Sequence, residues 1–355
     1  MTAGVALMSL AACSTDDNEA SNGSAAQQLE IRLSSSSLAA IDATRSFTST
    51  QLQSNDTVWV WTDMINGSTG QLTEYFKAWT LKTNGAGGLT PQVNGNAKLF
   101  PATNALNFYA IAGNFGKETD TGNSNYDNPK IVSEETTLPT TGILHTVLAN
   151  QQDAADYYKS DLLYAVVKGQ EPVAEAVQLP FAHMLSRIQV VLVAGNGMTV
   201  SDLSEATVTL LSLKRQVVFS PDSTKNFALQ ADRAGMLNIP NFASQGNLVM
   251  NNSAVATVAD ALSDATVYSD AIIVPQAIAA GAQLIKVSYL GRDTYLNAPT
   301  PDGLTFESGK QYRFRLTADR IGETYELSSV TMESWGANTT EAAWFDTITS
   351  EENKQ

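Results

Sequence analysis

Cysteine, histidine and long apolar runs are scarce in this sequence, and each scarcity excludes a class of protein. The 355 residues include one cysteine, Cys13, and two histidines. A single thiol cannot close an internal disulfide, so the folded body must be held by its apolar core and its backbone pairing. No stretch reaches the ~18–20 apolar residues that a membrane-spanning helix needs.

Positive charge is also in short supply. Lys and Arg number 21 against 36 Asp and Glu, which gives a formal net charge of −15. This acidic balance disfavours direct binding to nucleic acid or to anionic lipid surfaces, so we expect no nucleic-acid partner. With 43% hydrophobic residues, the chain still has enough apolar side chains to build real cores.

Patterns that carry catalysis or bind metals are missing. The sequence has no Gly-x-Ser-x-Gly elbow, phosphate-binding loop or HExxH motif. His145 lies in a Thr- and Asn-rich stretch that we expect at the surface, and His183 is expected to be a hydrogen-bonded core residue. The oxygen-rich run 118–125 lacks the full calcium-loop spacing, which favours a solvated loop. We therefore expect that the protein is not an enzyme and that it has neither a metal site nor a cofactor.

The one cysteine is placed as in a bacterial lipoprotein. A short apolar stretch, 5–10, leads into Leu10-Ala11-Ala12-Cys13, and polar, acidic residues follow. This pattern predicts a signal over 1–13, with lipid such as palmitate on Cys13 holding the protein at the outer membrane. Residues 1–12 carry no Lys or Arg, so we expect the natural start to lie upstream. Residues 14–28 hold no large apolar side chain and are expected to form a flexible tether.

Alternation of apolar and polar residues dominates the rest of the chain. It predicts strands, separated by Gly, Asn and Pro turns, over 29–33, 57–61, 75–81, 106–111, 188–193, 206–213, 271–274, 284–290, 311–316 and 326–335. Only 146–158 and 244–262 have weak helical periodicity. We therefore expect an all-β protein with two β-sandwich domains in tandem, 29–178 and 179–340, followed by a tail over 341–355.

Aromatic residues crowd one part of the first predicted domain. Trp59, Trp61 and Trp79 could form a platform on which sugars stack, although alternating aromatics are more often core and cross-strand pairs. A monomeric surface lipoprotein that binds glycans is therefore an alternative function.

Several short motifs, taken in order, resemble the fimbrillin family of Bacteroidales, which comprises the subunits of type V pili and their relatives. Besides the lipoprotein start, the motifs are 43–47 (ATRSF) before the 58–61 strand, 160–165 (SDLLYA), 179–188 (LPFAHMLSRI), Pro275-Gln276, 306–312 (FESGKQY) and Ser334-Trp335. The likeness spans nearly the whole chain.

The resemblance implies transthyretin-like sandwiches and an assembly route. An arginine-directed protease would cut between Arg45 and Ser46 and so release the first strand, with Leu29, Ile31 and Leu33, for replacement by a strand of another pilin. Alternatively, Arg45 is a solvated loop arginine that is not processed. The resemblance also implies a fimbrium exposed at the outer membrane surface, adhesion to a host or bacterial surface ligand, and a possible donor segment over 341–355.

Overall fold

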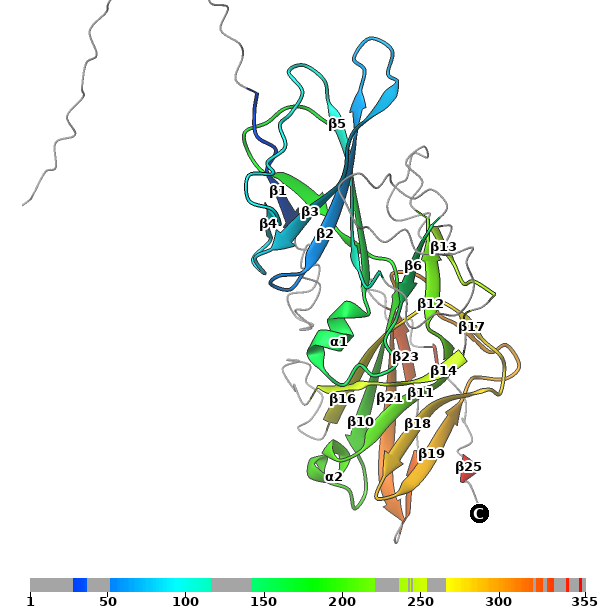
Figure 1. Cartoon of the computed structure of the whole chain (residues 1–355). Coiled ribbons are helices and arrows are strands. Elements are labelled where there is room, and N and C mark those ends of the chain that lie inside the picture. Colours follow the sequence, from blue (N-terminus) through cyan, green and yellow to red (C-terminus); the bar gives the residue numbers. More distant parts are fainter. Residues whose placement is uncertain are drawn as a thin grey trace, which may run out of the picture.

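Strands make up nearly all of the regular structure, which confirms the predicted all-β class. The computed structural model describes residues 28–36, 52–115, 142–220, 236–241, 243, 245–253, 266–321, 324–327, 331–334, 343–344 and 351–352. The described chain forms an elongated molecule in which an N-terminal lobe is stacked on a C-terminal lobe (Figure 1).

The N-terminal lobe is built on one eight-stranded sheet, in the order β8-β1-β4-β3-β2-β5-β7-β9. All neighbouring strands are antiparallel except β1 and β8, which are parallel. The strands are β1 Leu33–Ser36, β2 Thr57–Ile65, β3 Leu72–Thr83, β4 Gly88–Pro91, β5 Leu106–Gly113, β7 Leu162–Gln170, β8 Val177–Pro180 and β9 Ala182–His183.

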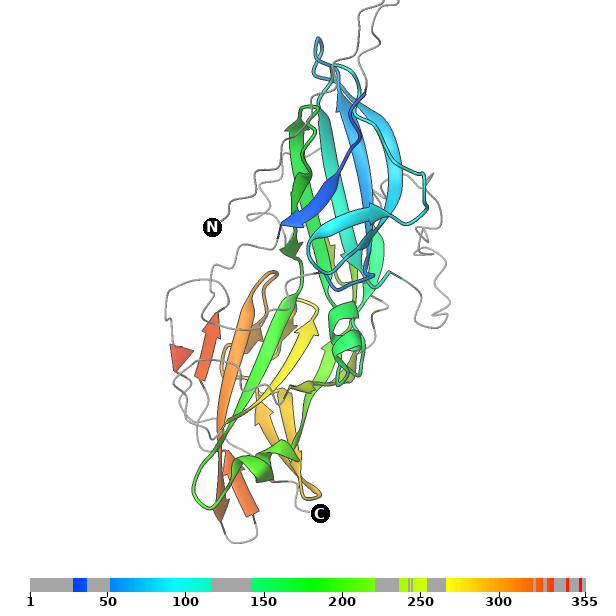
Figure 2. The ribbon, with the colours of Figure 1, turned by 90° about the vertical axis from the view of Figure 1, so that its left-hand side faces the viewer.

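This sheet curls over its own apolar face. One core cluster, the N-lobe core, takes side chains from strands across the sheet, including Leu33, Val60, Trp79, Phe108 and Leu179. Residues from distant strands of one sheet can meet only if the sheet bends around them. The curvature is visible in Figure 2, where β1 is the dark blue strand of the upper lobe.

Two sheets pack face to face in the C-terminal lobe. One has the order β15-β16-β10-β21-β23-β24, with β22 also paired to β21, and the other has the order β14-β11-β18-β19-β25. Their strands are β10 Ser186–Ala194, β11 Thr207–Lys214, β14 Gln245–Val249, β15 Asn251–Ser253, β16 Thr266–Ile273, β18 Gln283–Tyr289, β19 Arg292–Asn297, β21 Gln311–Ile321, β22 Thr324–Leu327, β23 Thr331–Ser334, β24 Ala343–Trp344 and β25 Glu351–Glu352.

Small sheets and two short helices complete the described structure. A three-stranded sheet joins β6 Ile143–Thr146 to β12 Gln216–Phe219 and β13 Leu237–Asn238, and β17 Ala277–Ile278 pairs with β20 Leu304–Thr305. The helices are α1 Ala154–Lys159 and α2 Val200–Ser204. The helix predicted over 146–158 is therefore confirmed only near its end. The helix predicted over 244–262 is wrong in its described part, because β14 and β15 pair there with β11 and β16.

A second core cluster connects the lobes. It lies between the two large sheets of the C-terminal lobe and continues to Trp61, Tyr109 and Tyr164 on the other face of the N-terminal sheet. The chain leaves the N-terminal sheet after His183, shortly beyond the predicted boundary at 178. However, β6 comes before that boundary and pairs with β12, which comes after it, so a strand of the predicted first domain joins a sheet with strands of the second.

Candidate functional site

Residues 29–36 fill a gap in the N-terminal sheet. Leu33 pairs with Leu89 of β4 on one side and with Val177 of β8 on the other, and the pairing with β8 continues to Ser36 and Pro180. Upstream, the Ile31 amide donates to the Lys98 carbonyl oxygen at 2.8 Å. This N-terminal segment is thus bonded along both of its edges.

The side chains of this segment also fill the core. Ile31 is 2% exposed and Leu33 is 3% exposed, and both belong to the N-lobe core. Leu29, in contrast, is 40% exposed. Two of the three residues predicted to lie in a displaceable strand are therefore buried anchors, and the strand itself begins only at Leu33.

A glycine sets the approach of β1 to the β3–β4 turn. Gly87 has φ +96, and its carbonyl oxygen accepts a 2.7 Å hydrogen bond from the Ser35 amide. A Cβ added at Gly87 would lie 2.9 Å from the Ser35 carbonyl oxygen. Glycine is required here both for the left-handed backbone and for the close contact.

The residues predicted to be processed cannot be placed in the same way. Cys13, Arg45 and Ser46 lie outside the described residues. Of the C-terminal tail, residues 343–344 pair with β23 and residues 351–352 pair with β19 of the same chain.

The three tryptophans do not share one exposed surface. Trp61 and Trp79 are each 2% exposed, and they lie in different core clusters. The Trp79 indole N–H donates to the Asn96 carbonyl oxygen at 3.0 Å. Because both faces of β2 are covered, its alternating side chains enter two cores. Trp59, which is partly buried, lines the junction cavity described below, whereas Trp61 and Trp79 do not line it.

Four of the motifs quoted above, 160–165, 179–188, Pro275-Gln276 and 306–312, meet at the junction of the lobes. Asp161 Oδ2 lies 2.5 Å from His183 Nδ1, which joins 160–165 to 179–188. The Gly309 amide donates to the Leu185 carbonyl oxygen at 2.9 Å, and the Phe306 amide donates to the Gln276 carbonyl oxygen at 2.9 Å. Segments far apart in the sequence therefore build one structural node.

A buried ion pair lies beside this node. The Arg187 guanidinium donates to Asp270 Oδ1 at 2.7 and 2.9 Å, and these side chains are 5% and 1% exposed. Burial alone would lower the pKa of Arg187, but the Asp270 carboxylate raises that pKa above its ordinary value. Burial also raises the pKa of the Tyr157 hydroxyl, which is part of the same electrostatic network.

The position of His145 shows that its predicted place at the surface was wrong. It was expected at the surface, but it is 0% exposed on β6 and its Nε2 lies 2.9 Å from the Ser160 carbonyl oxygen. Burial lowers the pKa of His145 from 6.5 to about 4. Local sequence gives no signal of this, because β12, the strand that pairs with β6, comes about 70 residues later in the chain. His183 is buried and hydrogen-bonded, as predicted.

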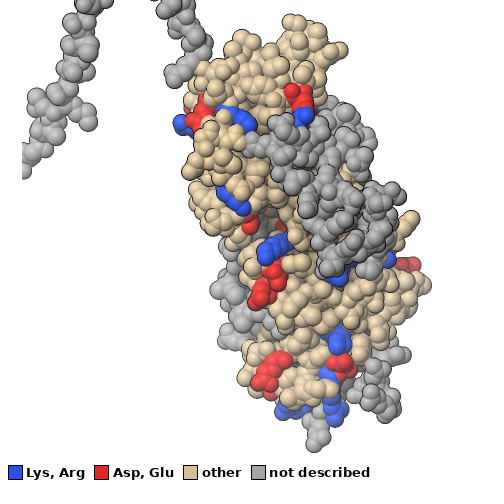
Figure 3. Space-filling model, viewed as in Figure 1, with Lys and Arg blue, Asp and Glu red and all other residues tan. Residues whose placement is uncertain are grey.

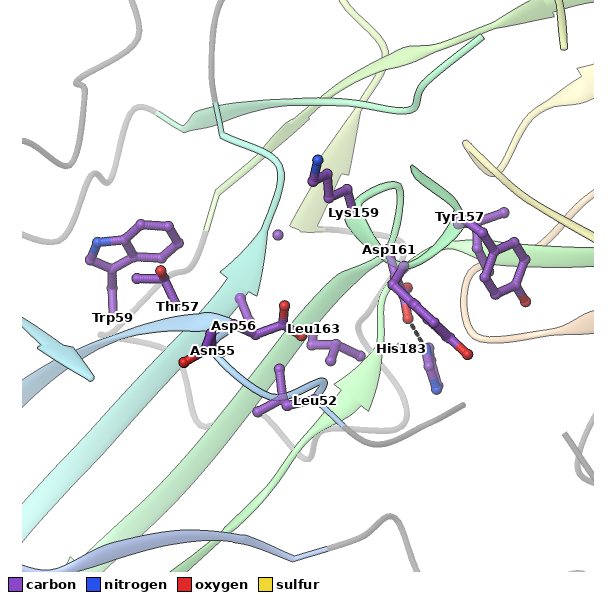
Figure 4. Close-up of a pocket in the computed structure, with 14 residues that line it drawn as sticks. Leu52, Asn55, Asp56, Thr57, Trp59, Tyr157, Lys159, Asp161, Leu163 and His183 are labelled. Carbon is purple, nitrogen blue, oxygen red and sulfur yellow. Dashed lines mark hydrogen bonds and ion pairs between the residues drawn. The ribbon is translucent and has the colours of Figure 1, made fainter. Parts of the chain in front are cut away.

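A cavity of about 220 Å³ lies at the junction (Figure 4). Its wall is shared by the chain before and within β2, the end of α1, and Asp161, His183 and Ile272. In Figure 4, Trp59 lies on one side, and Tyr157, Asp161 and His183 lie on the other. Aromatic, amide and charged groups thus meet in one space.

The described residues contain neither a metal site nor a membrane-spanning helix. No group of three or more His, Cys, Asp or Glu side chains there is arranged to hold a metal ion. Within the same part of the chain, no helix has the length and apolar character required to cross a membrane. On the face shown in Figure 3, acidic and basic side chains form small mixed groups.

Comparison with known proteins gives one family and a fold. The model of a family described as fimbrillin-like matches residues 44–335. A candidate cell adhesion protein of Bacteroides ovatus has a similar structure, with a TM-score of 0.57 at 16% identity, covering 88% of this chain and 99% of that chain. For one of Bacteroides uniformis the TM-score is 0.53 at 16% identity, with coverages of 87% and 98%. At these identities the structures show the fold alone. Among curated proteins, no relative matches this chain.

Proposed function

Since this chain belongs to the fimbrillin-like family, we propose that it is a subunit of a cell-surface fimbrium that assembles by strand exchange. In this proposal it is exported as a lipoprotein through Cys13, is held at the outer membrane, and is cut after Arg45. Its partners are other pilin subunits. The resemblance of its fold to candidate adhesion proteins supports a role in adhesion, and the proposal assigns the chain no catalytic activity.

The observation that carries the proposal is the position of residues 29–36. This segment separates β4 from β8, so its loss would leave unpaired backbone groups on both strands. It would also empty the positions of Ile31 and Leu33 in the N-lobe core. Open strand edges beside an apolar groove favour the addition of another strand.

Burial explains why exchange would give a durable polymer. Each fully buried large apolar side chain contributes roughly 1.5–3 kcal/mol, and the groove offers two such positions. A strand from a neighbouring subunit that fills both positions and restores the backbone hydrogen bonds would restore most of the stabilisation that the lost segment supplied.

Processing is the step that makes exchange thermodynamically accessible. While residues 29–36 are covalently joined to β2, they return to the groove at a high effective concentration. Cleavage after Arg45 removes this advantage, because the released segment can then diffuse away.

The proposal is tested by N-terminal sequencing of protein extracted from the cell surface, with electron microscopy of the same material. We expect chains that begin at Ser46 and filaments that contain them. Arg45→Ala should abolish both, whereas the matched change Arg292→Ala, at the exposed start of β19, should abolish neither. A mature chain that begins only at Cys13 would refute both cleavage after Arg45 and the strand exchange that depends on it.

A further inference from the structure

The cavity at the junction carries chemistry that strand exchange does not use. It is separate from the N-terminal segment, because none of residues 29–36 lines it. We infer that this cavity binds one ring of a neutral saccharide, with Trp59 as its apolar face and with Asn55, Asp56 and Tyr158 as its polar partners. This inference does not depend on assembly of a fimbrium.

Trp59 has the exposure and support that such a face needs. Unlike Trp61 and Trp79, it is only partly buried, and it lines the cavity. Phe115 meets it edge to face with ring centroids 5.5 Å apart, which fixes the indole orientation. The negative face of an indole attracts the weakly positive C–H bonds of a sugar ring, and its flat area covers them.

Asn55 presents an amide on a fixed backbone. The backbone N–H of Asn55 donates to the Thr83 carbonyl oxygen at 2.8 Å, and the backbone carbonyl oxygen of Asn55 accepts from Lys82 Nζ at 3.1 Å. The side-chain amide takes no part in these two bonds. The residue has φ 70, so the strand start turns sharply at this point. A primary amide supplies both donors and an acceptor, which suits a vicinal pair of hydroxyl groups.

The state of the carboxylates favours a neutral ligand over a cation. Asp161 already accepts from the Leu162 amide at 2.9 Å and pairs with His183. Asp56 Oδ2 accepts from the Gln53 amide at 2.6 Å. Lys159 adds a positive charge to the same wall. With its anions engaged and a cation beside them, the cavity offers mixed donors and acceptors and little net attraction for a second cation.

Size limits the ligand to a single ring. The cavity of about 220 Å³ is smaller than the roughly 300–1,000 Å³ of pockets that hold drug-sized molecules. A longer glycan would place one residue inside and leave the others outside. The affinity for a free monosaccharide should therefore be modest, with a dissociation constant of about 1 mM.

The test uses the full chain and the methyl glycosides of glucose, galactose, mannose and N-acetylglucosamine. Saturation-transfer NMR and titration should show saturable binding of at least one of them. Asn55→Gly removes the amide while glycine accepts the backbone angle, and Tyr158→Phe removes one hydroxyl group. We expect Asn55→Gly and Trp59→Ala each to weaken binding by about tenfold or more.

A matched control separates the cavity from general effects. Tyr75→Phe makes the same change as Tyr158→Phe on an exposed tyrosine that does not line the cavity, and it should leave binding unchanged. The inference is overturned if none of the four glycosides shows saturable binding. It is also overturned if Asn55→Gly, with its fold verified by circular dichroism, binds as the unchanged chain does. Nα-acetyl-lysine methylamide is a cationic probe of the same cavity. Binding of this cation in place of the sugars would equally refute the inference.

Discussion

Burial decides what individual polar residues do in this protein. Arg187 and Asp270 lie on neighbouring apolar strands and neutralise each other, whereas His145 stays uncharged because its pKa falls to about 4. A charged residue within an apolar strand is a sequence signal that a partner must exist, but it does not say which residue that partner is. The sequence thus indicates that a buried charged side chain needs a partner, and the fold determines which residue that partner is.

His145 should make the protein less stable in mild acid. The unfolded chain takes up a proton at this residue below about pH 6.5, while the folded chain resists protonation until about pH 4. The contribution of His145 to the free energy of unfolding is therefore fully present above pH 6.5. It is lost as the pH falls toward 4, and the loss is about 3 kcal/mol in all. Urea unfolding across this range should show a shallower pH dependence for His145→Gln. Equal slopes for the variant and the unchanged chain would contradict the prediction.

Asp270→Asn should destabilise the C-terminal lobe strongly, because it leaves the Arg187 charge buried without its counter-ion. A loss of about 3–5 kcal/mol is expected, measured by chemical denaturation. The double change Arg187→Met with Asp270→Leu removes both charges and should recover most of this loss. A double variant that is less stable than Asp270→Asn would show that the pair does more than balance charge.

At the scale of elements, β1 is the strand on which the proposed assembly depends. It is short, it has one parallel and one antiparallel neighbour, and among residues 28–35 only Ile31 and Leu33 lie in the N-lobe core. An element held by few buried contacts opens more readily than the central strands of its sheet.

Two glycines give a matched test of how firmly β1 is seated. Gly87 and Gly95 both have positive φ, but a Cβ at Gly95 meets nothing within 4 Å, whereas one at Gly87 would meet Ser35. Both alanine variants carry a backbone penalty of about 1–2 kcal/mol, and Gly87→Ala adds the clash. Amide hydrogen exchange at Ile31 and Leu33 should accelerate in Gly87→Ala and not in Gly95→Ala. Equal exchange in the two variants would mean that β1 does not depend on this contact.

At the scale of the whole molecule, chain segments on the two sides of the predicted boundary near residue 178 bond to each other. The β6 strand pairs with β12 across it. The Gln151 side chain also bonds to both the amide and the carbonyl oxygen of Ile272, at 2.9 and 2.8 Å. Residues of the predicted first domain therefore complete the second.

Fragments cut at residue 178 should consequently fail to fold alone. The piece 179–340 would expose Val217 and Phe219 of β12, which are both 0% exposed in the whole chain. We expect poorly dispersed NMR spectra and aggregation for this piece, while a piece that starts at residue 142 should be more soluble. A well-folded 179–340 fragment would show that the shared strand is dispensable.

The sequence by itself determined the β class and the positions of most central strands, such as 57–61 and 188–193, because alternation reports directly which residues share a face. It also predicted a short first strand over 29–33, whereas the strand in the structure is Leu33–Ser36. Only the tertiary structure decided what covers each face. It buried His145, sent Trp61 and Trp79 into separate cores, and brought Asp161 to His183 and Arg187 to Asp270. Those outcomes depend on pairing between strands far apart in the chain, about which local periodicity carries no information.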